Sequence, residues 1–473
     1  MKRYIDLMDK RSLKSESPQQ PWRLSRLVLY VVLAAYVALG SLYAIHTPAW
    51  QVPDEPAHYN YIRTIVEQHA LPVLQAGDYD QAYLEQLKSK LFPPDLPVTA
   101  IRYEGWQPPL YYLLAAPMFA ATGGSLVSIR LFTLLIGSFI VVLTWRLARE
   151  IFPGEPGLAL TAAGFVAFVP QHVAMMAAAN NDALTEVLIV LGLWLLVRML
   201  LGAQVPGWAL GLVLGLGFLT KLTAYPLAGL IVLALLLVAR RQRWSARRLI
   251  SALLRVYVPA ILLGCLWWVR NLVVYGGLDF LASQRHDAVV FGQPRTSELL
   301  AQWGAALYAR NFVQTTFQSF WGQFGWMGVV MDRRVYWALV VYTAALLVGL
   351  AGAFWANGRT HRRARRLSGT QTDILVLLIA AILLAVAAYF YYNLTFVQFQ
   401  GRYLYPALPV FGLGAAIGLR QWARWVTAIL RSDLAGPRRW LVMFLPLGPI
   451  ALMAALDLFA LYRFIIPSLT LPG

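Results

Sequence analysis

Long apolar stretches alternate with short polar segments along most of the chain. A helix needs about 20 apolar residues to cross the ~30 Å hydrocarbon core of a bilayer. Eleven stretches approach or exceed that length, and the fifth and tenth of them are short. We therefore expect an all-α polytopic membrane protein with about 11 transmembrane helices, over residues 27–45, 126–149, 158–178, 182–201, 207–220, 223–240, 248–271, 336–357, 372–393, 403–419 and 439–463.

A further apolar stretch, residues 107–123, is not expected to cross the membrane. It holds about 14 apolar residues and opens with two prolines, so it suits an interfacial or re-entrant helix better than a span. With this stretch left out, the loops alternate so that every strong basic cluster falls on one side. Those clusters lie at residues 146–150, 239–248, 358–366 and 420–439.

This distribution of Lys and Arg predicts the topology, because cytoplasmic loops of membrane proteins carry the excess of positive charge. Residues 1–26 are expected to form a cytoplasmic N-terminal segment, and residues 27–473 a single integral membrane domain. Its long outer loops are expected at residues 46–125 and 275–335, with interfacial helices in the first.

Composition agrees with this class of protein. Of the 473 residues, 59% are hydrophobic and only 13% are charged, which lies outside the usage of soluble domains. The net charge of +18 does not indicate a nucleic-acid partner, because the basic residues gather in the short loops. The single cysteine, Cys265, excludes an internal disulfide and a cysteine-based metal site. The N-terminal segment is too long and polar for a cleaved secretory leader, so we expect the first helix to be retained.

An acidic, histidine-containing segment follows the first apolar stretch. In "WQVPDEPAHYN", residues 50–60, Asp54 and Pro56 are suited to start a helix that carries Glu55 and His58. Residues four apart lie on one helix face, so Asp54 and His58 should project together with Glu55 beside them. Two interpretations stay open at this point: Asp54 caps the helix while Glu55 complements its dipole, or the two carboxylates are catalytic.

A second acidic segment, "AAANNDALTEVL" at residues 177–188, lies where the third helix emerges and the fourth begins. Asp182 can cap that fourth helix. It is also expected at the same depth and on the same side as Asp54, with Glu186 one helical turn further in. Two outward helix ends would then bring carboxylates to one layer.

Three cations are expected at outward helix ends, where the positive-inside bias disfavours them. They are Lys221 in "FLTKLTAYP", Arg270 in "LWWVRNLVVYGG" and Arg402 in "FVQFQGRYLYPALP". Such side chains often snorkel toward lipid phosphates. Alternatively they hold a substrate phosphate between helices, since guanidinium groups bind phosphate bidentately and Lys supplies a compact charge.

Carboxylates and cations on an outer face favour one reaction. A carboxylate can accept the proton of an acceptor hydroxyl that attacks an anomeric carbon, while cations stabilise the departing phosphate. We interpret the pattern as inverting glycosyl transfer from a polyprenyl-phosphate sugar, because a site outside the cell cannot rely on cytosolic nucleotide sugars. The acceptor can be a lipid, a glycan or a protein.

The ordered motifs resemble those of the polytopic GT-C glycosyltransferases, a superfamily that includes protein O-mannosyltransferases and the lipid A aminoarabinose transferase. The shared features, in chain order, are the acidic pair Asp54 and Glu55, the aromatic and Pro-Pro segment Trp106 to Tyr112, Asp182, Lys221, and "GRYLYP" from Gly401 to Pro406.

The resemblance implies a role for each motif. In the family the first Asp is the catalytic base or an acceptor-binding residue, which implies that role for Asp54; we expect Asp54 to be the base, with Glu55 beside it. One departure is Gln107, where aminoarabinose transferases have Lys, which removes one phosphate contact. The resemblance also implies a multi-pass protein of the bacterial cell envelope. Substrate is expected to be bound by His58, Gln107, Asp182, Lys221, Arg270, Arg402 and Tyr403.

The acidic residues and the histidine raise the question of a bound metal. Asp54, Glu55, His58 and Asp182 could together bind Mg²⁺ or Mn²⁺, but the nearby cations suffice for the phosphate, so we expect no obligatory metal. No HExxH, P-loop or dinucleotide-binding fingerprint is present. A secondary transporter and an envelope glycan polymerase or ligase remain as alternatives.

Overall fold

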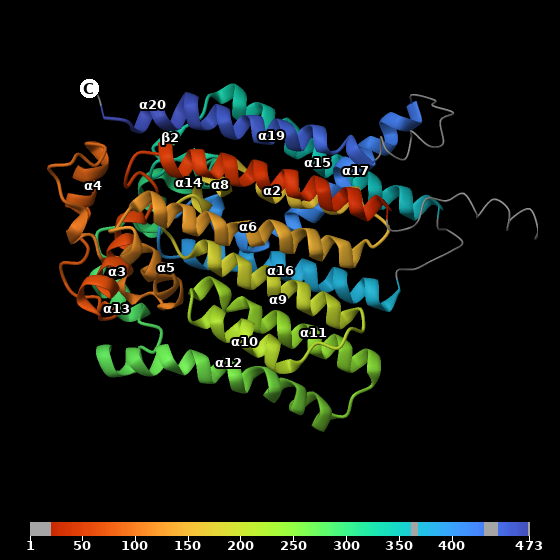
Figure 1. Ribbon diagram of the computed structural model, residues 1–473, viewed down its shortest axis with the longest axis horizontal. Helices are drawn as coiled ribbons and strands as arrows, with labels where there is room; N and C mark the ends of the chain where they lie inside the picture. The colour runs from red at the N-terminus through yellow and green to blue at the C-terminus, as the bar shows by residue number, and fades with distance from the viewer. Residues whose placement is uncertain (1–19, 361–367, 430–442, 472–473) are drawn as a thin grey trace, which may run out of the picture.

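The computed structural model describes residues 20–360, 368–429 and 443–471. Long helices run side by side along the molecule, and the only strands among the described residues are the two short strands of one hairpin (Figure 1). The expected all-α polytopic fold is confirmed. The N-terminal segment up to residue 19, the 361–366 part of the basic cluster at 358–366, the second half of the 420–439 segment and residues 440–442 lie outside the described residues.

Eight helical segments in the described ranges are long and apolar enough to cross a membrane. Their main helices are α2 (Gln20–His46), α6 (Leu126–Ile151), α9 (Asp182–Leu200), α11 (Pro226–Gln242), α12 (Ala246–Tyr275), α15 (Arg333–Thr360), α16 (Gly369–Asn393) and α19 (Leu447–Ala460). The last segment continues through a π-helical turn, η6 (Leu461–Ile465), into α20 (Ile466–Leu469).

The expected count of eleven spans is not confirmed, although each expected stretch is mainly helical where it is described. The third stretch is a bent pair, α7 (Pro156–Ala167) and α8 (Pro170–Met176), which meet at 66° and raise the count to nine if they form one span. Pro170 causes the break, because proline has no amide hydrogen to continue the helix. The fifth stretch is the short α10 (Gly207–Phe218), and the tenth is divided between η5 (Gly401–Ala407) and α17 (Leu408–Ile429).

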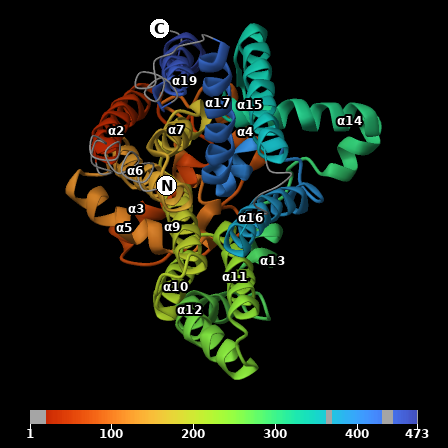
Figure 2. The ribbon, with the colours of Figure 1, turned by 90° about the vertical axis from the view of Figure 1, so that its right-hand side faces the viewer.

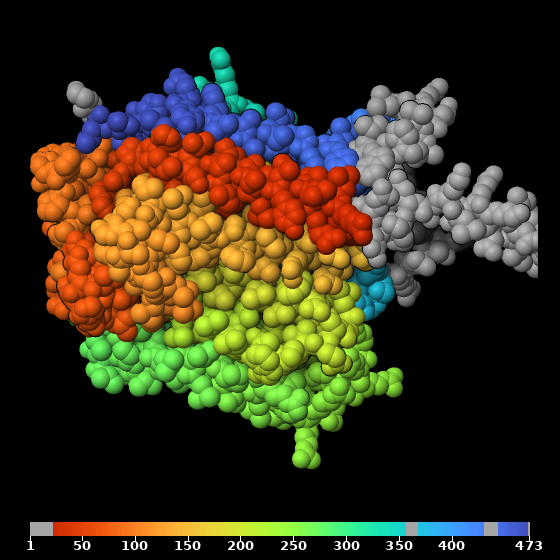
Figure 3. All heavy atoms as spheres, viewed as in Figure 1, coloured from red at the N-terminus to blue at the C-terminus, as the bar shows by residue number. Residues whose placement is uncertain are grey.

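The first long connection forms a layer over one end of the bundle (Figures 1 and 3). It contains α3 (Glu55–Gln68), α4 (Gln81–Ser89), two short 3-10 turns, η2 (Val98–Ala100) and η3 (Tyr103–Trp106), and α5 (Leu110–Ala121). The stretch expected not to cross is α5, whose 12 residues extend only ~18 Å. It packs on α3, where the rings of Tyr61 and Tyr112 stack with centroids 3.7 Å apart.

The second long connection lies at the same end. It contains α13 (Ser283–Val289), α14 (Thr296–Trp321) and the hairpin of β1 (Gln323–Phe324) and β2 (Val329–Val330). The first part of α14 projects from the bundle as an arm (Figure 2), and the helix kinks at Gly304, whose φ of 74° favours glycine. Its last turns pack on η5 inside the bundle.

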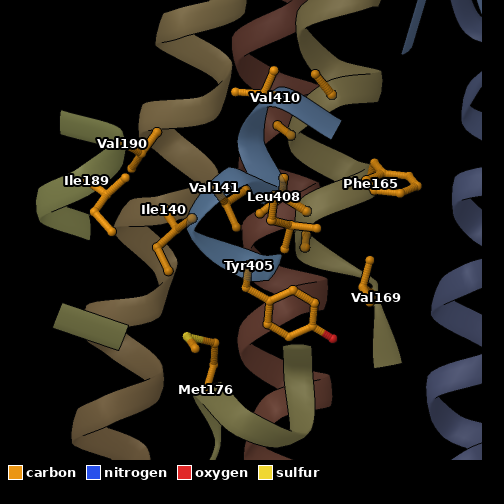
Figure 4. Close-up of a cluster of buried hydrophobic side chains, with 14 of the residues drawn as sticks. Ile140, Val141, Phe165, Val169, Met176, Ile189, Val190, Tyr405, Leu408 and Val410 are labelled. Atoms are coloured by element: carbon orange, nitrogen blue, oxygen red, sulfur yellow. The ribbon is translucent and has the colours of Figure 1, made fainter. Parts of the chain in front are cut away.

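A buried apolar cluster supports the end of the bundle that carries the site (Figure 4). Side chains of α6, α7, α8, α9 and α17 meet there around Tyr405 of η5. Tyr405 donates a hydrogen bond of 2.7 Å to the carbonyl of Phe320 in α14. Close packing of this kind fixes the backbone from which the functional side chains project.

Candidate active site

A cavity of about 800 Å³ opens where the layer of outer segments meets the ends of the long helices. It is formed by the start of α3, the η3 turn, the start of α9, the turn after α10, the end of α16 and η5. Seven of the nine residues predicted for the site line it: Asp54, His58, Gln107, Asp182, Lys221, Arg402 and Tyr403.

Asp54 precedes α3 in the left-handed backbone conformation, with φ 69°, and its side chain makes no capping hydrogen bond. The carboxylate instead accepts a hydrogen bond of 2.7 Å from the Tyr103 hydroxyl and pairs with the Arg402 guanidinium at 2.9 Å. Burial alone would raise the pKa of Asp54, but the positive charge of Arg402, with the hydrogen bond from Tyr103, outweighs burial and lowers that pKa. The capping interpretation therefore does not apply to this side chain.

Arg402 is positioned by the backbone around it. A Cβ atom at Gly401 would lie 2.3 Å from the carbonyl oxygen of Thr316, so only glycine allows η5 to approach α14 this closely. Gly401 also donates its amide hydrogen to Ser319 Oγ at 2.7 Å. The Arg402 side chain is 9% exposed, and its buried Nε has no hydrogen-bond partner among the described residues. A buried guanidinium hydrogen beside a cavity is a donor available to an anionic ligand.

Asp182 and Lys221 form a second carboxylate and cation pair. Asp182 opens α9, and its Oδ1 lies 2.5 Å from Nζ of Lys221. Lys221 is held in an extended turn between α10 and α11, and its side chain is 18% exposed. The two predicted acidic segments are therefore brought to one cavity, each beside a cation.

His58 lies one helical turn from Asp54, as expected, and lines the same cavity. Its Nδ1 is 2.8 Å from the Tyr112 hydroxyl. Burial and the positive charge of Lys221 lower the pKa of His58 to about 3, so the ring is neutral near pH 7. A neutral buried imidazole can orient a substrate hydroxyl but adds no charge to the cavity.

Gln107 and Tyr403 complete the predicted lining. Gln107 accepts a long contact of 3.4 Å from the Asn181 amide, which ties the Pro-Pro segment to the start of α9. The Tyr403 ring lies under the Arg402 guanidinium, with its centroid 5.4 Å from the central carbon. Tyr389 and Tyr392 of α16 continue the aromatic wall beside Tyr403.

Two predicted residues are not brought into the cavity. Glu55 is fully buried on the other side of α3 and receives two hydrogen bonds, of 2.8 and 2.6 Å, from Arg130 of α6. Arg270 donates to the carbonyl of Pro72 at 2.6 Å and lies over the Trp267 ring at 4.5 Å. Both placements favour a structural role.

The sequence did not single out Tyr103 and Glu104, which also line the cavity. Tyr103 holds Asp54, and burial raises the pKa of its hydroxyl well above the usual value, so it remains a donor. Glu104 follows it in η3, and its Oε2 is buried without a hydrogen-bond partner among the described residues. Burial and the charge of Asp54 raise the pKa of Glu104 to about 7. Their position, five and four residues before the Pro-Pro pair at 108–109, was the available signal.

Asp54, Glu55, His58 and Asp182 are the candidate metal ligands from the sequence. Across the residues that the structure describes, no group of three or more His, Cys, Asp or Glu is arranged to hold a metal ion. Glu55 faces away from the other three. The expectation that no metal is obligatory stays a prediction.

The chain was compared with known proteins. Residues 106–268 match the family described as dolichyl-phosphate-mannose-protein mannosyltransferase. No curated protein is significantly similar in sequence.

Among solved structures, ArnT from Cupriavidus metallidurans bound to undecaprenyl phosphate is 17% identical, with a TM-score of 0.47, covering 95% of this chain and 74% of that one. The same protein in the apo state is 16% identical, with a TM-score of 0.48, covering 93% of this chain and 73% of that one. The archaeal oligosaccharyltransferase AglB from Archaeoglobus fulgidus, in complex with an inhibitory peptide and a dolichol-phosphate, is 12% identical, with a TM-score of 0.49. The match covers 92% of this chain and 56% of that one. The chain thus spans little more than half of the archaeal protein. The match over residues 106–268 confirms the resemblance to the GT-C glycosyltransferases.

Proposed function

We propose that the protein is a GT-C-type glycosyltransferase that moves a sugar from a polyprenyl-phosphate donor to an acceptor hydroxyl. The observation that carries this proposal is the cavity in which Asp54 lies between an arginine with an unpartnered buried Nε and a second carboxylate and lysine pair. The family matched over residues 106–268 is described by a donor of the same chemical class.

The donor phosphate is assigned to Arg402 and Lys221. A phosphate oxygen near Arg402 would take up the free Nε hydrogen and then share the guanidinium with Asp54. Lys221 approaches from the turn after α10 and adds a second positive charge. Both cations stabilise the negative charge that collects on the phosphate as the sugar departs.

Asp54 is assigned the role of base. The acceptor oxygen attacks the anomeric carbon and forms the new glycosidic bond, while the bond between that carbon and the phosphate oxygen breaks. The electron pair of the broken bond stays on the polyprenyl phosphate, and the acceptor proton passes to Asp54. A single displacement of this kind inverts the anomeric configuration.

Other cavity residues are assigned to binding. Asp182 positions Lys221, and His58 with Gln107 offers neutral hydrogen-bonding groups to the sugar or acceptor hydroxyls. Tyr403 and Tyr405 border the route proposed for the lipid, where aromatic rings provide apolar surface with a polar edge.

The reaction is assigned to the outer face of the cell membrane, with the N-terminus in the cytoplasm. The described arginines at residues 146–149 and 240–248 lie at the end of the bundle opposite the cavity (Figure 1). The excess of positive charge marks the cytoplasmic side in most membrane proteins. The cavity then faces the periplasm or the exterior, where a donor is presented by the membrane.

The direct test is turnover of a panel of short polyprenyl-phosphate sugars by the purified chain, with membrane extract as the source of acceptor. Released polyprenyl phosphate is measured by mass spectrometry. We expect Asp54→Asn to lower turnover by ~10²–10⁴, because an amide cannot accept the proton. Asp80→Asn is a matched control, since Asp80 caps α4 outside the cavity. Equal turnover by wild type and Asp54→Asn would contradict the role of Asp54.

A further inference from the structure

A second cavity, of about 550 Å³, lies among α10, α11, α12 and the loop between α9 and α10. These segments meet at the end of the bundle opposite the candidate active site (Figure 1). We call it the arginine pocket, because Arg247, Arg248 and Arg255 line it together with Ser251 and Trp244.

The arginine pocket has no negative charge of its own. No Asp or Glu lines it, and none of the three arginines forms an ion pair within the described residues. Neighbouring arginines differ in this respect, because Arg240 and Arg241 approach Asp373 to 3.2 and 3.3 Å. The pocket therefore gathers three positive charges that the described part of the protein leaves uncompensated.

The start of α12 adds to this imbalance. The helix begins at Ala246, and Arg247 and Arg248 occupy its first turn with no acidic residue beside them. The N-terminal end of a helix carries partial positive charge, so cations there are unfavourable and anions are favourable. A bound phosphate would compensate both the helix end and the guanidinium groups.

Apolar surface continues from the pocket into the membrane-spanning part. Leu210, Leu235 and Val256 form its inner wall. On α12 the next exposed side chains recur every four residues, so they form one stripe along the helix. The stripe consists of Leu254, Val258, Leu262 and Leu266, which are 48–68% exposed.

We propose that the arginine pocket binds the phosphate of an anionic phospholipid whose acyl chains lie along α12. A phosphate on a glycerol backbone combines the negative charge that the arginines lack with chains that cover the exposed stripe. Basic pockets between helices on the cytoplasmic side are suited to such headgroups. This inference does not depend on the transfer reaction.

Thermal unfolding of the full chain in an uncharged detergent tests the proposal, because a ligand of the folded state raises its melting temperature. The probes are dihexanoyl phosphatidylglycerol, dihexanoyl phosphatidylcholine and inorganic phosphate. We expect the melting temperature to rise with phosphatidylglycerol alone at matched concentration. Arg247→Gln with Arg255→Gln should weaken the apparent affinity by roughly 30-fold, whereas Arg243→Gln, which removes a charge outside the pocket, should retain it.

Each other outcome contradicts part of the proposal. An equal rise with phosphatidylcholine would show that the negative charge is not recognised, and an equal rise with inorganic phosphate would overturn the lipid as ligand. An unchanged affinity in the double variant would overturn the pocket. If the double variant does not fold, Arg255→Gln alone is measured, with an expected loss of about fivefold.

Discussion

Asp54 and Arg402 are 348 positions apart in the chain, yet their side chains meet at 2.9 Å inside the cavity. The pair joins the residue assigned as base to the residue assigned to the donor phosphate. A phosphate that competes for the guanidinium would weaken the pair, and the pKa of Asp54, which Arg402 helps to lower, would rise. Donor binding would thereby make Asp54 a better proton acceptor.

The first prediction concerns Arg402→Lys. An ammonium group cannot reproduce the fork of a guanidinium, so the variant should bind a short polyprenyl phosphate more weakly than wild type. The measurement is the rise in melting temperature on adding the lipid, which should be smaller in Arg402→Lys and nearly absent in Arg402→Ala. Equal rises in all three proteins would leave Arg402 as an interfacial anchor.

The second prediction concerns Glu55→Gln. This change leaves the Arg130 guanidinium buried without its charged partner, so we expect a loss of about 3–5 kcal/mol in the free energy of unfolding. Glu67→Gln, on the exposed end of the same helix, should lose far less. A Glu55→Gln protein with wild-type stability and no turnover would instead support the catalytic role predicted for Glu55 from the sequence.

The third prediction concerns the pH dependence of stability. The pKa of Glu104 is raised from 4.5 to about 7 in the folded protein, so the folded state holds a proton that the unfolded chain has lost. The stability from this group is therefore complete below pH 4.5 and is lost as the pH rises through 7. The melting temperature of wild type should fall relative to Glu104→Gln between pH 5 and 8. Parallel curves for the two proteins would contradict the raised pKa.

The fourth prediction concerns topology. In a Cys265→Ser background, a cysteine at Arg240, whose side chain is 74% exposed, should be shielded from an impermeant thiol reagent in intact cells. A cysteine at Phe291, which is 67% exposed and lies near the cavity end, should be labelled. The reverse pattern would place the cavity in the cytoplasm and overturn the use of a donor presented outside.

The long helices could be predicted because uninterrupted apolar stretches leave few other structures possible in a membrane. The shared cavity of Asp54, Asp182, Lys221 and Arg402 could also be anticipated, since helix ends on one side lie in one layer. The number of membrane spans was harder to predict from the sequence, because a proline bends the third apolar stretch and the tenth apolar stretch opens as a 3-10 turn.

The orientation of neighbouring side chains could not be predicted. Glu55 was expected beside Asp54, but the left-handed backbone at Asp54 and the pairing with Arg130, 75 positions away, place it on the opposite side of the helix. Tyr103 and Glu104 lie in a short turn with no periodic pattern, so their approach to Asp54 depends on contacts distant in sequence.

The most direct test of the central claim is a cryo-EM structure of the full chain with a saturating polyprenyl phosphate. We predict phosphate density in the cavity within about 3 Å of the Arg402 guanidinium and beside Lys221, with the pair between Asp54 and Arg402 lengthened. The lipid should leave the cavity past Tyr403. Phosphate density elsewhere, with an empty cavity and an unchanged pair between Asp54 and Arg402, would contradict the proposed reaction.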